Sequence, residues 1–147
     1  MKRLLGVLLT ASFAVVLTAS AVRAAEKDPA QRRVPADQLA AAQALKNPVP
    51  ATPASIAKGK ELFNGKGACF TCHGPEGKGD GVVGQALNPS PRNFHNAAFW
   101  KNRTDGELMW VLQHGSPGTS MVAAVPVTVT EEEGWQIIDY LRTFKGK

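Results

Sequence analysis

Residues 69–73 read Cys-Phe-Thr-Cys-His, and this run limits the fold of the 147-residue chain more than any other feature because it contains the only two cysteines. The spacing is the attachment signature of a c-type haem. Cys69 and Cys72 can each form a thioether with one vinyl group of the porphyrin, and His73 can then bind the iron as its proximal axial ligand. The expected cofactor is one covalently held haem c, around which the chain must fold.

Other uses of a Cys-x-x-Cys pair fit the sequence less well. A thioredoxin-like redox pair is expected near a βαβ pattern, and nothing in the sequence indicates one. A zinc site takes about four nitrogen or sulfur ligands, usually as two spaced pairs, whereas here one cysteine pair precedes three scattered histidines. A disulfide across two residues would close too small a loop to stabilise the fold much.

The N-terminus is typical of an export signal. A basic start is followed by an apolar run over residues 4–17 and by small residues before Ala25. We therefore expect a signal peptide at 1–24 and a periplasmic haem domain. The alternative is an uncleaved anchor, because residues 4–22 carry no charge and are just long enough to span a bilayer. Membrane contact is expected only through such an anchor or through a membrane complex.

The charge balance excludes one class of partner. The full chain has 17 basic and 12 acidic residues, and removal of Lys2, Arg3 and Arg23 with the signal leaves 14 basic residues against 12 acidic ones. A net charge of +2 is too small for a nucleic-acid-binding surface, so no nucleic acid partner is expected.

The rest of the chain divides into two parts. Residues 25–54 are rich in Ala and Pro, with a short helix predicted at 37–45, and form either a spacer or an arm packed on the domain. Residues 55–147 are expected to form the haem domain. Because 93 residues are few for a domain that must bury its own core, the haem is expected to supply apolar bulk.

Helical patterns dominate residues 55–147. Ser55 is a good N-cap for a helix over 56–63, where Gly59 indicates that another helix crosses closely. Thr104 begins a helix over 105–113, and Thr130 opens a capping box for a helix over 131–144 with apolar residues at helical spacing. Four glycines within residues 74–81 predict a tight irregular loop that can wrap round a flat cofactor, the alternative being a flexible surface loop.

These features together resemble the bacterial class I mono-haem cytochromes c over residues 55–144. The resemblance is carried by Gly59 and Phe63, by Cys-x-x-Cys-His-Gly followed by Gly-Lys-Gly-Asp-Gly, by a later Gly-x-x-Met, and by a last helix containing Tyr140. It implies an all-α fold of three to five helices wrapped around one covalently bound haem. In this fold the N- and C-terminal helices cross near Gly59, Phe63 and Tyr140.

The resemblance also implies a methionine sulfur as the second axial ligand, from a loop after the third helix. Met121 lies in such a loop, although Val122 follows it where many relatives have proline. Met109 lies within a helix, where core packing explains it. His95 and His114 are competing ligands because haem iron also binds imidazole.

Three further site residues come from the resemblance. The carbonyl of Pro89 is expected to accept the second ring proton of His73, and Arg92 and Trp100 are expected to bind the haem propionates. Alternatively, Pro89 is a simple turn residue and Trp100 packs beside Phe99.

An iron with both axial positions filled by protein has no open site for a small molecule. We therefore expect an electron carrier and not an enzyme, shuttling electrons between respiratory redox proteins. Two alternatives stay open: a subunit bound stably in a larger membrane oxidoreductase, and a small peroxidase in which Met121 must leave the iron.

Overall fold

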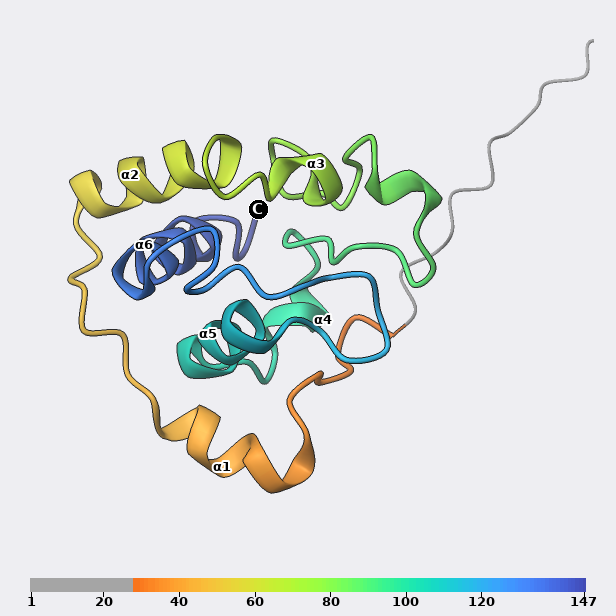
Figure 1. Ribbon diagram of the computed structural model, residues 1–147, viewed down its shortest axis with the longest axis horizontal. Coiled ribbons are helices and arrows are strands. Elements are labelled where there is room, and N and C mark those ends of the chain that lie inside the picture. Colours follow the sequence, from red (N-terminus) through yellow and green to blue (C-terminus); the bar gives the residue numbers. More distant parts are fainter. Residues whose placement is uncertain (1–27) are drawn as a thin grey trace, which may run out of the picture.

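The computed structural model describes residues 28–147, and within them every regular element is helical (Figure 1). The predicted signal at 1–24 lies outside the described residues. The elements are α1 (Ala36–Ala44), α2 (Pro53–Asn64), α3 (Phe70–His73), the 3₁₀ turn η1 (Gly84–Ala86), α4 (Ala97–Trp100), α5 (Asp105–His114) and α6 (Glu131–Arg142). The all-α prediction is confirmed. Helices α3 and α4 are single turns, so the four longer helices form the framework.

The first and last helices of the haem domain cross, as predicted, and this crossing is the centre of the fold. A Cβ atom built on Gly59 of α2 would lie 1.9 Å from the backbone oxygen of Gln136 and 3.0 Å from Cβ of Tyr140. Next to this point the rings of Phe63 and Tyr140 meet edge to face, with centroids 5.5 Å apart. Only glycine at position 59 lets the two backbones approach so closely.

The start of α2 differs from the prediction. The N-cap is Thr52, whose hydroxyl accepts a hydrogen bond from the Ser55 N–H, and Pro53 occupies the first helical position. Proline is favoured there because its missing N–H would have no partner in the helix anyway. Ser55 lies inside the helix instead, and its Oγ donates to the buried Asp139 of α6 at 2.5 Å.

Helices α5 and α6 begin where the sequence predicts. Thr104 and Thr130 each accept a hydrogen bond from the backbone N–H three residues on, while Glu107 and Glu133 bond back to the N–H of the capping threonine. Both capping boxes are complete. Helix α6 ends at Arg142, two residues before the predicted end.

The segment before α2 packs on the domain as an arm. Val34 and Ala42 are buried against Trp110 of α5, whose indole N–H donates to Gln38 at 2.8 Å. A Cβ on Gly106 of α5 would lie 2.0 Å from the Ala42 carbonyl oxygen, so α1 and α5 touch backbone to backbone. Over the described residues, no helix combines the length and apolar character needed to cross a membrane.

Candidate haem site

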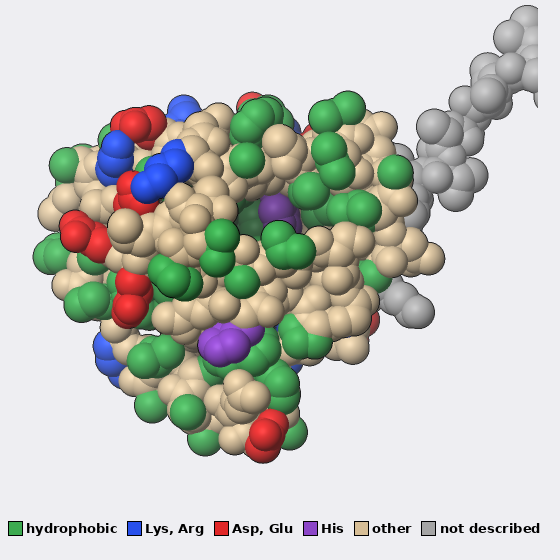
Figure 2. Space-filling view, viewed as in Figure 1, with side chains coloured by type: hydrophobic (Ala, Val, Ile, Leu, Met, Phe, Trp, Pro, Cys, Tyr) green, Lys and Arg blue, Asp and Glu red, His purple; other side chains and the backbone are tan. Residues whose placement is uncertain are grey.

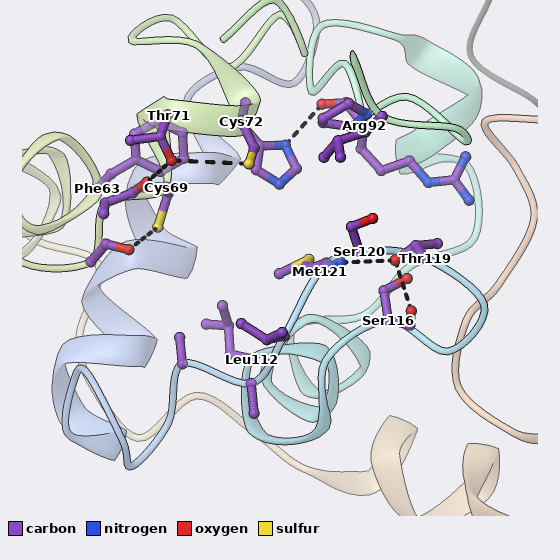
Figure 3. A pocket seen from close by; sticks show the side chains of 18 of the residues that line it. Phe63, Cys69, Thr71, Cys72, Arg92, Leu112, Ser116, Thr119, Ser120 and Met121 are labelled. Carbon is purple, nitrogen blue, oxygen red and sulfur yellow. Dashed lines mark hydrogen bonds between the residues drawn. The ribbon is translucent and has the colours of Figure 1, made fainter. Parts of the chain in front are cut away.

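A cavity of about 370 Å³ lies between α3, the loop after α5 and helix α6. Apolar side chains from several segments line it, including Leu112, Ile137 and Leu141. Figure 3 shows Cys69 and Cys72 on one wall, with Met121 on the opposite side and its side chain extending into the space between them. A mainly apolar cleft of this size is typical of cofactor sites.

Helix α3 places both cysteines and His73 on the cavity wall. A helix of four residues is not stable alone, so its carbonyl groups need partners elsewhere. The glycine-rich segment supplies them: the N–H of Gly79 donates to the His73 carbonyl at 2.8 Å, and the N–H of Gly81 to the Cys72 carbonyl at 3.1 Å.

This contact corrects the expected role of the loop at residues 74–81. None of these residues lines the cavity. The loop folds against the back of α3, where a Cβ on Gly81 would lie 2.3 Å from the Thr71 carbonyl oxygen. Its glycines therefore allow the backbone to approach α3, and they do not wrap the cofactor face.

The His73 ring is buried and fixed in orientation. It is 8% exposed, stacks on Phe94 with ring centroids 4.7 Å apart, and its Nδ1 lies 3.1 Å from the backbone oxygen of Arg92. Desolvation by burial lowers the pKa of His73. The hydrogen bond to the Arg92 carbonyl raises this pKa, but its effect is smaller. Because a carbonyl oxygen can only accept a hydrogen bond, Nδ1 of His73 carries a proton. The lowered pKa favours the neutral ring. The Nε2 lone pair is left to bind a metal.

The accepting carbonyl thus belongs to Arg92, whereas the sequence prediction was Pro89. Both residues lie in the same cavity-lining segment at positions 89–92, so the segment was identified but the acceptor was wrong by three positions. The side chain of Arg92 also lines the cavity, and its guanidinium donates to the carbonyls of Asp28 and Gln31 in the arm, at 2.8 and 2.9 Å.

Trp100 does not reach the cavity. It is buried in the core, where its indole N–H donates to the Phe94 carbonyl at 2.6 Å and the Arg142 guanidinium lies 4.9 Å from the ring centroid. Its only hydrogen-bond donor is therefore engaged, and Trp100 is not placed to bind a propionate. The packing alternative describes it correctly.

Met121 lines the cavity from an irregular loop that is held by its own hydrogen bonds. The Met121 N–H donates to the Thr119 hydroxyl at 3.2 Å, and its carbonyl accepts from the Ser116 N–H at 3.0 Å. Farther along, the N–H groups of Ala124 and Val125 both donate to the Leu112 carbonyl of α5. The loop is fixed at both ends without a proline after Met121.

The other ligand candidates lie away from the cavity. His95 Nε2 donates to the Glu76 carbonyl at 2.8 Å, and His114 stacks on Trp110 at the end of α5. Met109 has no exposed surface and packs beside Gly134. Of the four candidates, only Met121 lines the cavity.

Arg33 is a cavity residue that sequence analysis does not identify. It comes from the arm, far from residues 69–73 in sequence, and lines both the main cavity and an adjoining hollow of about 70 Å³. Its Nε is buried and has no hydrogen-bond partner among the described residues. Burial and the nearby Arg92 charge lower the pKa of Arg33.

The residues present fit a haem c. The two thiols are free of each other, and burial raises the pKa of Cys69 to about 11, opposite to the lowered value of a redox-active dithiol. Over residues 28–147, no group of three or more His, Cys, Asp or Glu side chains is placed to hold a metal ion. Two thiols, one oriented imidazole, one methionine sulfur and two guanidiniums around an apolar cleft instead match the chemistry of a haem with acidic side chains.

Comparison with known proteins agrees with this geometry. Among solved structures, a chain of the Kuenenia stuttgartiensis reducing HAO-like protein complex is similar in fold, with a TM-score of 0.58 and 23% sequence identity. The similarity covers 69% of this chain and 49% of that one, so the present chain corresponds to about half of its neighbour. No curated protein matches. The family model of cytochrome c matches residues 56–145, and the chain therefore belongs to the cytochrome c family and carries a covalently bound haem c.

Proposed function

We propose that this protein is an exported single-electron carrier whose haem iron is held by His73 and Met121. The observation that carries this proposal is that His73, with Nε2 free, and Met121 both line one cavity, whereas His95, His114 and Met109 do not. Haem c, when bound, supplies one-electron redox chemistry at its iron. If His73 and Met121 both bind the iron, no position would be left on it for a substrate.

The protein's own residues keep this site rigid and dry. The Arg92 carbonyl holds the His73 ring in one tautomer, and the hydrogen-bonded loop holds the Met121 backbone in place. Apolar side chains of Leu112, Ile137 and Leu141 exclude water from the cleft. A site with little freedom to rearrange between oxidation states favours electron transfer over bond chemistry.

A set of exposed apolar side chains, here called the apolar rim, provides a surface for redox partners: Phe70, Val82, Val83, Val122 and Val127. Val122 lines the cavity itself, Phe70 stands in the sequence between the cavity residues Cys69 and Thr71, and the Val83 N–H donates to the Thr71 carbonyl. Figure 2 shows hydrophobic side chains around a hollow in which a histidine is visible, with charged side chains gathered over the α2–α6 end. Small apolar contacts suit weak, short-lived redox encounters.

A second candidate is the same haem module as a stably bound subunit of a larger oxidoreductase. It is favoured by the fold neighbour, which is part of a protein complex. Gel filtration of native material distinguishes the two: a carrier elutes as a small haem protein, whereas a subunit co-elutes with larger partners.

Export to the periplasm is part of the proposal. N-terminal sequencing of the native protein tests it, because the mature protein is expected to start near Ala25.

The ligand assignment is tested with Met121→Ala. The weak far-red absorption band that methionine sulfur gives to ferric haem should disappear, while the haem remains attached through its thioethers. The matched control is Met109→Leu, a volume-conserving change in the core that should leave the band intact. A band that persists in Met121→Ala would show that Met121 is not the ligand.

Peroxide turnover at the rate of a dedicated peroxidase in the wild type would contradict the carrier function.

A further inference from the structure

The arm places a short strap, residues 28–34, along the edge of the haem cavity where Arg92 lies. Backbone carbonyls of the strap are bonded by arginines of the haem domain: Arg92 donates to Asp28 and Gln31, and Arg103 donates to Pro29 at 3.1 Å and also to Gln31. The strap is therefore attached to the domain along its length.

The two arginines of the strap have different surroundings. Arg32 pairs with the buried carboxylate of Glu107 at 2.8 Å and donates to the Asn102 carbonyl at 2.6 Å. Arg33 lines the cavity, and its Nε is buried without an acceptor. Burying a guanidinium N–H without a hydrogen-bond acceptor raises the free energy of the folded protein. We therefore expect a group in the cavity to accept a hydrogen bond from Arg33 Nε.

The charges around the cavity indicate the chemistry of that partner. Arg33 and Arg92 both line the main cavity, and their like charges oppose each other. None of the cavity-lining residues is an aspartate or glutamate. In the adjoining hollow the carboxylate of Glu107 is already bonded to Arg32. An anionic group on the cofactor would give the Arg33 Nε an acceptor and would offset the like charges of Arg33 and Arg92.

We propose that Arg33 is a haem-propionate residue and that the strap is part of the cofactor site. Its guanidinium donates a charge-assisted hydrogen bond to a propionate and thereby stabilises the reduced haem electrostatically. The strap lies outside the residues 56–145 that match the cytochrome c family, so this contact is added to the family fold by the arm. The inference needs a haem c in the cavity but does not depend on Met121 or on the electron-carrier role.

The test is the midpoint potential of the full-length haem protein and its dependence on pH. Arg33→Gln should lower the ratio of reduced to oxidised protein at a fixed ambient potential by about threefold to tenfold, because a nearby positive charge is lost. A tenfold change corresponds to about 59 mV for a one-electron couple. Loss of the cation should also raise the pKa of the propionate. The midpoint potential of Arg33→Gln should therefore begin to vary with pH at a higher pH than that of the wild type.

Two further variants separate this role from a structural one. Arg32→Gln removes the same charge from the adjacent strap residue that does not line the cavity, and it should leave the pH dependence of the potential as in the wild type. Arg33→Lys keeps the charge and should keep most of the potential. The proposal is overturned if Arg33→Gln changes the potential and its pH dependence no more than Arg32→Gln does. It is also overturned if Arg33→Lys lowers the potential as much as Arg33→Gln, because the charge would then not matter.

Discussion

At the scale of single residues, Asp139 is a carboxylate buried between the first and last helices of the haem domain. It accepts hydrogen bonds from Ser55 Oγ at 2.5 Å and from Asn47 Nδ2 at 2.7 Å. Desolvation nevertheless raises the pKa of Asp139 above its ordinary value of 3.8, with the nearby Asp105 charge adding to this and the two hydrogen bonds opposing it. The folded state therefore favours the protonated carboxyl more than the unfolded state does.

This raised pKa predicts a pH dependence of stability. As pH rises from about 4 through the raised pKa, the folded protein binds more protons at Asp139 than the unfolded protein, so the free energy of unfolding falls. Asp139→Asn removes this dependence, and the stability of the variant relative to wild type should increase between about pH 4 and pH 7. Thermal denaturation across that pH range measures the difference.

The control for this prediction is Asp37→Asn, which removes an acidic charge from the exposed side of α1. Its stability relative to wild type should change less with pH. A stability difference for Asp139→Asn that stays constant with pH, or that moves in the opposite direction, would contradict the prediction.

The roles of individual residues in the haem site were the hardest feature to predict from the sequence. The motif at 69–73 identified the cofactor because thioether attachment depends on local spacing. In contrast, the acceptor for His73 is Arg92 and not the predicted Pro89. The sequence left two roles open for Trp100, and its N–H is bonded in the core, as the packing alternative expects. Arg33 was missed because its place in the cavity depends on how a distant arm packs, and no local pattern records that.

At the scale of elements, the crossing of α2 and α6 depends on Gly59. Gly59→Ala would place a methyl group 1.9 Å from the Gln136 carbonyl oxygen, and backbone cannot move aside as a flexible side chain can. The free energy of unfolding should fall by about 3 kcal/mol, the upper part of the range for overpacking. Urea denaturation followed by far-ultraviolet circular dichroism measures this loss.

Lys60→Ala is the matched control, since it changes the next residue of the same helix on the exposed side. It should alter the free energy of unfolding by no more than about 0.5 kcal/mol. If Gly59→Ala proved as stable as Lys60→Ala, the close backbone contact between α2 and α6 would be wrong.

The helices themselves were largely predictable because their signals are local. Capping threonines and apolar spacing located α5 and α6, and Gly59 indicated the crossing before any contact was known. The start of α2 was misassigned because Ser55 and Thr52 are both good caps, and the proline at position 53 favours the earlier one. The role of residues 74–81 could not be read from composition, since glycine permits close approach to a cofactor and to a helix equally.

At the scale of the whole molecule, the apolar rim predicts how the protein meets other redox proteins. The rim valines Val82, Val122 and Val127 are 78–82% exposed, so the contact surface that they offer is apolar. Electron self-exchange between oxidised and reduced protein should therefore depend weakly on ionic strength. NMR line broadening of haem resonances in mixtures of the two forms measures the exchange rate.

A charge placed on the rim should change this behaviour. Val122→Lys should slow self-exchange several-fold at low salt, because two like charges then meet at the contact, and added salt should restore the rate. Ala57→Lys adds the same charge on the exposed side of α2 and serves as the control. An equal slowing in both variants would show that electrons do not pass through this surface.

The position of α6 also bears on the order of events during biosynthesis. Ile137 and Leu141 of this last helix form part of the cavity wall, and the helix packs across α2 at Gly59. A nascent polypeptide that still lacks residues 131–147 therefore cannot close the cleft beneath Cys69 and Cys72. Until that final helix packs across α2, both thiols stay accessible for attachment to the porphyrin.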